Sequence, residues 1–113
     1  FIVDRAKDMV IRGGENVYCT EVEAAIYEHP AIAEAAVFAV PDERLGERVG
    51  VAMVLLSGES LTADELRAHT AALIASFKVP EDVWFLDDPL PRNANGKFVK
   101  RELRDMLVGT TVD

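Results

Sequence analysis

Two apolar runs of strand length follow one another near the middle of the chain, AEAAVFAVPD at residues 33–42 and ERVGVAMVLL at residues 47–56. Continuous apolar runs of this length, bounded by turn residues, are typical of buried strands. Pro41, Asp42 and Gly46 lie where the runs meet, and these residue types favour turns. We therefore predict that the two runs form central strands of a small sheet.

The segment DMVIRGGENVY (residues 8–18) predicts an N-terminal β-hairpin. Gly13 and Gly14 stand between two short strand-like stretches, and paired glycines supply the positive φ angles that a tight hairpin turn requires. EDVWFLDDPLP (residues 81–91) predicts a further strand, which its prolines end. The pattern indicates a hairpin and a small central sheet of about three strands.

A first helix is predicted over TEVEAAIYEHP, residues 20–30. Thr20 and Glu23 have the Thr-x-x-Glu spacing of a capping box, and Pro30 ends the segment. The apolar positions that share one helical face are Val22, Ala25 and Ile26.

Two more segments predict helices, residues 62–77 and residues 100–107. The first opens with a second Thr-x-x-Glu cap at Thr62 and Glu65. The apolar positions at helical spacing are Leu66, Leu73 and Ile74 in the first segment and Leu103, Met106 and Leu107 in the second. With three helices flanking the sheet, the whole chain, residues 1–113, is predicted to be one α+β domain.

Composition limits the setting and the partners. The chain has 12 lysines and arginines against 20 aspartates and glutamates, a net charge of −8, which argues against nucleic acid as a partner. Cys19 is the single cysteine, so no internal disulfide can form. The sequence shows no signal peptide and no apolar run long enough to span a membrane, and these features predict a cytoplasmic location.

The segment PRNANGKFVK (residues 91–100) begins a local excess of positive charge. Between residues 92 and 104, five cations, Arg92, Lys97, Lys100, Arg101 and Arg104, face Glu102 alone, so the segment carries +4 and the remainder −12. An isolated basic patch on an acidic domain is a candidate anion site. We interpret Lys100, Arg101 and Arg104 as a solvated face beside such a site.

Several familiar catalytic and metal-binding patterns do not fit. Gly96 and Lys97 do not form a phosphate-binding P-loop, which needs glycine at the place of Pro91 and serine or threonine at the place of Phe98. The three potential metal ligands His29, His69 and Cys19 lack the close spacing of metal sites, and we predict no metal site. We interpret His29 as a helix-end residue and His69 as a helix-surface residue.

Three stretches of the chain together resemble one family. DRAKDMVIRGGENVYCTEVEAAI (residues 4–26) and LPRNANGKFVKREL (residues 90–103) resemble the two signature stretches of the C-terminal domain of the adenylate-forming superfamily, and residues 29–54 resemble its centre. That superfamily includes acyl-CoA synthetases, the adenylation domains of peptide synthetases, and luciferases. The departures are Cys19, where the family usually has proline, and Asn93, where threonine is common.

The resemblance implies an enzymatic function. Residues 1–113 would be the mobile C-terminal lid of an ATP-dependent acyl-CoA ligase, whose larger N-terminal domain lies outside this chain and binds ATP and the acyl substrate. The reaction adenylates a carboxylic acid, expected to be a fatty or related acid, releases pyrophosphate, and then forms a thioester with coenzyme A. ATP, Mg²⁺ and CoA would serve the full-length enzyme, and we expect the isolated chain to be inactive.

The same resemblance assigns roles to five residues. Lys97 corresponds to the lysine that acts in adenylation, Arg5 to an arginine near the adenylate ribose, and Lys7 to the hinge about which the lid turns. Gly13 and Gly14 correspond to a hairpin that faces the CoA channel in the second pose. Residue types alone leave simpler readings open: a solvated loop lysine, a charged linker, and glycines that serve only the turn.

Two other functions remain as alternatives. The chain could be a non-catalytic binding module with this fold. It could also be the lid of a fatty acyl-AMP ligase or of a peptide-synthetase adenylation domain, which passes its adenylate to a carrier protein in place of CoA.

Overall fold

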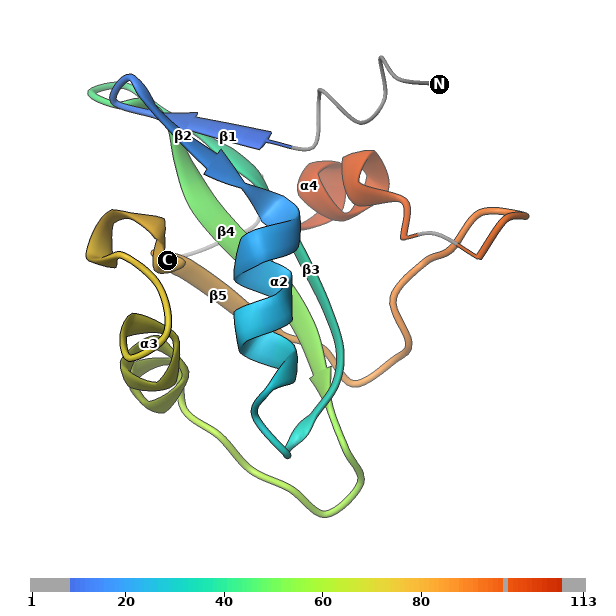
Figure 1. Cartoon of the computed structure of the whole chain (residues 1–113). Coiled ribbons are helices and arrows are strands. Elements are labelled where there is room, and N and C mark those ends of the chain that lie inside the picture. Colours follow the sequence, from blue (N-terminus) through green and yellow to red (C-terminus); the bar gives the residue numbers. More distant parts are fainter. Residues whose placement is uncertain (1–8, 97, 109–113) are drawn as a thin grey trace.

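The computed structural model describes residues 9–96 and 98–108, and these form an α+β domain (Figure 1). The elements in chain order are β1 (Met9–Arg12), β2 (Glu15–Tyr18), α2 (Cys19–Tyr27), β3 (Ile32–Asp42), β4 (Gly46–Leu55), α3 (Ala63–Ala71), the short 3₁₀ helix η1 (Ser76–Lys78), β5 (Asp82–Phe85) and α4 (Lys100–Val108). The predicted α+β class, the N-terminal hairpin and the three helices are confirmed. None of the described helices is both long and apolar enough to cross a membrane.

The five strands belong to one sheet, in which β4 is central. β3 and β4 pair antiparallel along nearly their whole length, with Val37 opposite Val51. β5 pairs with β4 in parallel, because α3 and η1 carry the chain back to the other end of the sheet. The β1–β2 hairpin joins through the pairing of Arg12 with Gly46. The prediction of about three central strands therefore describes β3, β4 and β5, and the hairpin extends the same sheet.

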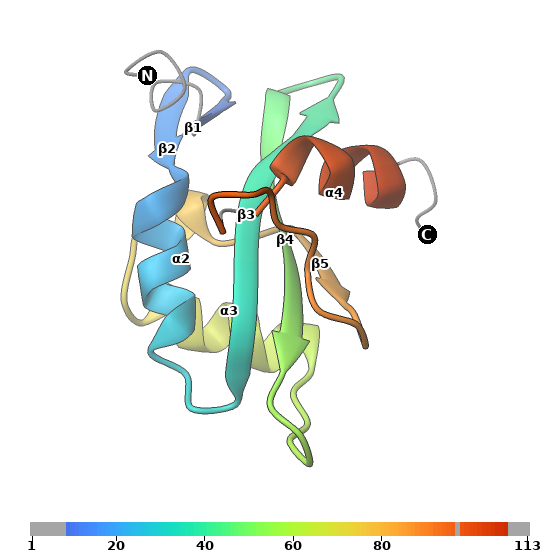
Figure 2. The ribbon, with the colours of Figure 1, turned by 90° about the vertical axis from the view of Figure 1, so that its right-hand side faces the viewer.

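Both faces of the sheet are covered, α2 and α3 lying on one face and α4 on the other (Figure 2). One buried cluster combines strand residues such as Val37 and Val51 with Ile26 of α2 and Leu66 of α3. The second cluster contains Ala36, Phe38, Val40, Ala52, Leu90, Leu103 and Leu107. Because neighbouring residues of a strand point to opposite faces, a strand covered on both faces is mostly apolar, as residues 35–40 and 49–55 are.

Gly50 of β4 lies beside Val40, Trp84 and Phe38 of this second cluster. The rings of Phe38 and Trp84 stack with centroids 5.7 Å apart. A Cβ placed on Gly50 would lie 2.6 Å from Val40 Cγ2 and 3.1 Å from Trp84 Cζ3. The missing side chain at position 50 therefore makes room for its neighbours.

The start of α2 differs from the prediction. The helix begins at Cys19, its N-cap residue Tyr18 makes no side-chain cap, and the predicted capping box of Thr20 and Glu23 is wrong. Glu23 instead accepts a hydrogen bond from the backbone amide of Val37 on β3, at 2.9 Å. The predicted buried face of α2, Val22, Ala25 and Ile26, is confirmed.

Two side chains of α2 also reach backbone groups of β3 that are not paired with β4. The Tyr27 hydroxyl accepts a hydrogen bond from the Ala35 amide at 2.8 Å and lies 3.3 Å from the Ala35 carbonyl oxygen, to which it donates. With the Glu23 contact to Val37, side chains of one helix thus bind backbone groups of two alternate positions on this strand.

The second predicted helix is confirmed at its start and too long at its end. Thr62 and Glu65 form the predicted capping box, with reciprocal hydrogen bonds of 3.1 and 2.9 Å. Helix α3 ends at Ala71, so Leu73 is exposed while Ile74 still packs against the core. In α4, Leu103 and Leu107 are buried as predicted, but Met106 points outward and is half exposed.

Candidate functional site

The basic segment before α4 forms a closed loop. Arg92 and Phe98 pair as an isolated antiparallel bridge, and the Val99 amide donates to the Pro91 carbonyl at 3.0 Å. The two ends of the loop, at residues 91–92 and 98–99, therefore lie side by side. Figure 2 shows the segment crossing in front of β3, between α2 and α4.

The tip of this loop is a tight turn that its sequence favours. The Asn93 side chain accepts from the Asn95 amide at 2.8 Å, and the Asn93 carbonyl accepts from the Gly96 amide at 3.0 Å. Gly96 has a φ of +83°, a conformation that glycine adopts without the steric cost of a Cβ. Asparagine and glycine thus build a turn that ends directly before position 97.

Lys97 itself lies outside the described residues, as do Lys7 and Arg5. Their predicted roles stay predictions. For Lys97 the structure gives the two neighbours, Gly96 at the exposed tip and the half-buried Phe98 at the base of the loop.

Two cations of the basic segment are paired with glutamates. Arg92 Nη2 lies 3.1 Å from Glu34 Oε2, and Lys100 Nζ lies 2.8 Å from Glu23 Oε2. The interpretation of Lys100 as part of a solvated face is therefore wrong, whereas Arg101 is exposed as predicted. The candidate anion patch is smaller than its sequence charge indicates.

Arg104 is likewise exposed, as predicted for the solvated face.

Sequence reasoning missed Glu34 and Glu23 as partners of the loop. Glu34 carries one available signal, because it is the only charged residue in the apolar part of its run, between residues 33 and 40. A charge in a central strand needs a partner, although the sequence does not say which.

The glycines of the hairpin turn are both in the left-handed region, with φ of +58° at Gly13 and +90° at Gly14. Two positive φ angles in a two-residue loop fit a type I′ turn, as the paired glycines predict. The Gly13 amide donates to the Leu45 carbonyl at 2.9 Å, and a Cβ there would lie 3.2 Å from Leu45 Cδ2. A Cβ on Gly14 would meet no atom within 4 Å. Gly13 thus serves the fold, while the space beside Gly14 is open.

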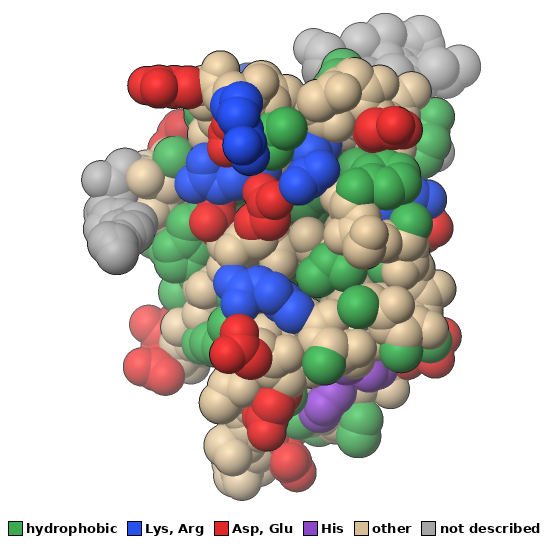
Figure 3. Space-filling model, turned by 90° about the vertical axis from the view of Figure 1, so that its left-hand side faces the viewer, with side chains coloured by type: hydrophobic (Ala, Val, Ile, Leu, Met, Phe, Trp, Pro, Cys, Tyr) green, Lys and Arg blue, Asp and Glu red, His purple; other side chains and the backbone are tan. Residues whose placement is uncertain are grey.

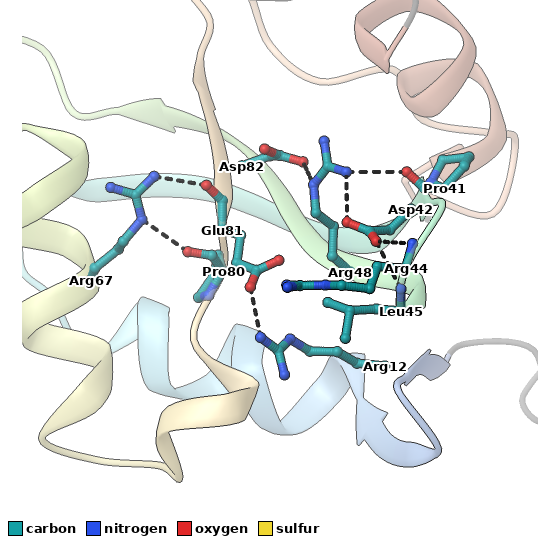
Figure 4. Close-up of polar contacts among 10 residues, drawn as sticks. All are labelled: Arg12, Pro41, Asp42, Arg44, Leu45, Arg48, Arg67, Pro80, Glu81 and Asp82. Atoms are coloured by element: carbon teal, nitrogen blue, oxygen red, sulfur yellow. Dashed lines mark hydrogen bonds and ion pairs between the residues drawn. The ribbon is translucent and has the colours of Figure 1, made fainter.

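One ion pair, drawn in Figure 4, and one hydrogen bond connect this hairpin to the rest of the sheet. Arg12 Nη2 lies 2.7 Å from Glu81 Oε2, just before β5, and the Ile11 amide donates to Glu47 Oε1 at 2.8 Å. Arg67 of α3 donates to the Glu81 carbonyl at 2.8 Å. The hairpin, β4, β5 and α3 are thereby connected.

The neighbouring connection between β3 and β4 is ordered by Asp42 and Arg48 (Figure 4). Hydrogen bonds from the backbone amides of Leu45 and Arg44, followed by the Arg48 guanidinium, lower the pKa of the Asp42 carboxyl. The hydrogen bond from Arg48 Nε to Asp82 Oδ2, at 2.6 Å, is the largest cause that raises the pKa of Arg48. On the face shown in Figure 3, basic side chains lie beside acidic ones.

The two histidines lie together low on the same face (Figure 3). Their rings meet edge to face with centroids 5.1 Å apart. His29 follows α2 and accepts from the Ala31 amide at 3.1 Å, which confirms the helix-end interpretation. His69 also bridges to α2, with Nε2 2.8 Å from the Ala25 carbonyl oxygen, so it is more than a surface residue. Within residues 9–96 and 98–108, no three His, Cys, Asp or Glu side chains could hold a metal ion.

The hairpin turn and the loop before α4 lie on opposite sides of the domain. Figure 1 shows the β1–β2 turn at one side and the loop that precedes α4 at the other. Each is fixed to the sheet by its own contacts, Arg12 to Glu81 for the hairpin and Arg92 to Glu34 for the loop.

Comparison with known proteins gives consistent results. Mouse medium-chain acyl-CoA ligase ACSF2, a mitochondrial protein, is 42% identical over 106 residues, which are 94% of this chain and 17% of that protein. The fatty acid–acyl-carrier-protein ligase ScoC of Streptomyces coeruleorubidus is 43% identical over 109 residues, 96% of this chain and 21% of that one.

A solved fatty acyl-CoA synthetase of Mycobacterium tuberculosis superposes with a TM-score of 0.83 at 36% identity, covering 91% of this chain and 20% of the other. The chain thus spans about a fifth of the length of these relatives. Residues 21–97 match the model of the AMP-binding enzyme C-terminal domain. This chain therefore belongs to the family of AMP-binding enzyme C-terminal domains.

Proposed function

We propose that the chain is the mobile lid of a cytoplasmic, ATP-dependent acyl-CoA ligase that acts on a fatty or related carboxylic acid. A larger N-terminal domain of the same protein would supply most contacts to ATP and to the acid. The family match and the names of the relatives support this proposal: ACSF2 is described as an acyl-CoA ligase, and ScoC as a fatty acid ligase.

The main structural support for the proposal is the position of two turns, the β1–β2 turn and the turn in the loop before α4. The two turns lie on opposite sides of the domain (Figure 1), and this separation supports a model in which one active centre meets them one at a time. A domain that uses both would present first one and then the other to the active centre. It would do so by rotating, and changes in a few backbone dihedral angles suffice for that rotation. We assign the hinge to Lys7, where the sequence approaches β1.

In the first pose the loop before α4 would face ATP. Attack of the carboxylate on the α-phosphate concentrates negative charge at one phosphorus, and Mg²⁺ would share in neutralising it. The compact ammonium of Lys97 can contact a carboxylate oxygen and a phosphate oxygen together, which stabilises the transition state most in a closed, dry site. Arg5 would contact the ribose of the adenylate.

In the second pose the hairpin would face the thiol channel. Gly14 has no neighbour within 4 Å of a Cβ position, so a pantetheine arm could pass close to its backbone. The acceptor could be CoA or the same arm on a carrier protein, as the name of ScoC indicates for that relative. Offering the full-length protein both acceptors, with ATP and a series of fatty acids, distinguishes these cases by the product formed.

We expect the isolated chain of 113 residues to form no acyl-CoA, although it folds. The reason is that most substrate contacts would belong to the larger domain. Mass spectrometry of reactions with ATP, fatty acid and CoA, run on the isolated chain and on the full-length protein, measures this. Product from the isolated chain would refute the lid assignment, and no adenylate or thioester from the full-length protein would favour a non-catalytic binding module.

Substitution of Gly14 should separate the two half-reactions. Gly14→Ala and Gly14→Leu place the same strain on a residue with φ of +90°, but only leucine adds bulk beside the turn. In the full-length protein we expect Gly14→Leu to slow thioester formation about tenfold relative to Gly14→Ala, with pyrophosphate exchange into ATP similar in both. Equal rates for the two variants would leave Gly14 with a role in the turn alone.

A further inference from the structure

One carboxylate holds the entrance of the loop before α4. Glu34 Oε1 accepts from the Leu90 backbone amide at 2.7 Å, and Glu34 Oε2 accepts from Arg92 Nη2 at 3.1 Å. The Glu34 side chain is 18% exposed, so both of its oxygens are used in a largely desolvated place on β3. A carboxylate with two donors in such a place resists displacement more than an exposed surface pair does.

Arg92 extends this attachment from the base of the loop to its tip. Its guanidinium lies over the Phe98 ring, 4.6 Å from the centroid, and Nη1 is 3.4 Å from the Gly96 carbonyl oxygen. Phe98 and Gly96 are the residues on either side of position 97. The planar guanidinium can bind Glu34, the ring and the loop backbone together, which a lysine ammonium cannot do with the same geometry.

A second glutamate binds at the far end of the loop. Glu23 of α2 binds Lys100 at 2.8 Å, at the first residue of α4. The two ends are therefore fixed by separate contacts, and the Glu34–Arg92 pair also contacts Gly96 and Phe98 beside position 97. Loss of the Glu34 contact should loosen the tip while α4 stays in place.

We propose that Glu34 and Arg92 are positioning residues for the adenylation step. Through the Phe98 ring and the Gly96 carbonyl they set the place and direction in which the loop presents its tip, without themselves contacting the reacting atoms. The inference rests on the proposed function, in which Lys97 acts at the α-phosphate. Misplacement of a reacting group by about 1 Å can lower a rate by about 10², so a loose tip should be visible in the rate.

The test uses the full-length protein with the variants Glu34→Gln, Arg92→Ala and their combination. Glutamine keeps an oxygen for the Leu90 amide and nearly the same volume, but its amide nitrogen places a donor against the Arg92 guanidinium. Glu21→Gln is the matched control, because Glu21 forms an ion pair with Lys78 at 2.9 Å on another part of the surface. Backbone amide hydrogen exchange measures the loop, and the two half-reactions measure its use.

We expect amide exchange at Gly96 and Val99 to rise about tenfold or more in Glu34→Gln and Arg92→Ala, with exchange in α3 unchanged. The kcat for pyrophosphate exchange should fall about tenfold, while the KM for ATP and for the acid stays within about twofold. The kcat of the double variant should be no lower than that of the worse single variant, because both substitutions break the same Glu34–Arg92 contact. Capture of preformed acyl-adenylate by CoA should be unchanged, and Glu21→Gln should match the wild type.

Three results overturn the inference, and they are distinguishable. If Lys97→Ala abolishes adenylation while Glu34→Gln and Arg92→Ala leave it at the wild-type rate, the positioning role is rejected and the proposed function stands. If Lys97→Ala adenylates normally, the proposed function fails and the positioning role fails with it, even if amide exchange shows the looser loop. Equal loss of both half-reactions would indicate a general structural role instead.

Discussion

Replacement of Lys97 by alanine in the full-length protein is expected to lower the rate of adenylation by about 10² or more, the effect of removing one preorganised electrostatic donor. The loss should appear in kcat, because the ammonium would act where charge develops at phosphorus. Folding should hardly change, since the neighbouring Gly96 at the tip of the loop is exposed.

The second half-reaction makes this prediction specific. CoA capture of a supplied acyl-adenylate should continue in the Lys97→Ala variant, because the loop would point away from the site in the second pose. Arg101→Ala is a suitable control, since it removes an exposed cation of the same basic segment and should change neither rate more than about twofold. Normal pyrophosphate exchange in Lys97→Ala would remove Lys97 from the mechanism, and loss of both halves would reject the two-pose model.

The Gly50→Ala substitution is expected to lower the free energy of unfolding by about 1–3 kcal/mol, the usual cost of an extra methyl group in a packed core. Two effects compete at this position. Alanine restricts the unfolded chain more than glycine does, which stabilises by about 0.4–1 kcal/mol where the backbone permits it. Overpacking should prevail, because the new Cβ would lie 2.6 Å from Val40 Cγ2, on the strand that pairs with β4.

A double-mutant cycle with Val40→Ala tests this cause directly. Removal of Cγ2 takes away the closest contact, so Gly50→Ala should cost less than about 1 kcal/mol in the Val40→Ala background. Urea unfolding of the four proteins, followed by circular dichroism, gives the comparison. An equal cost of Gly50→Ala with and without Val40 would show that the crowding at this position is not the cause.

Local sequence patterns predicted the elements whose causes are local. The Gly13-Gly14 pair specifies the hairpin turn through its φ angles, and Thr62 with Glu65 specifies the start of α3. The same Thr-x-x-Glu pattern failed at Thr20, because Glu23 finds partners on β3 and α4 that are remote in sequence. A side chain that could cap a helix locally can instead bind a partner that is remote in sequence, and the cap is then not formed.

In the candidate site, too, local sequence predicts some features, whereas others depend on contacts between residues that are remote in sequence. The turn before position 97 is readable from its asparagines and Gly96, which bond within a few residues of one another. The attachment of the loop is not readable, because Glu34 lies 58 residues from Arg92 in sequence. The roles of Lys97, Lys7 and Arg5 come from the family resemblance and not from local patterns.

The contacts of α2 with β3 also bear on how the protein behaves in a crowded solution. A strand at the margin of a sheet exposes unpaired amides and carbonyls, and these can recruit a strand from another molecule. On β3 the Tyr27 hydroxyl occupies both backbone groups of Ala35, and Glu23 occupies the amide of Val37. A foreign strand would have to displace these side chains and bury the Glu23 carboxylate. The side chains of α2 thus protect the margin around Ala35 and Val37 from intermolecular pairing and aggregation.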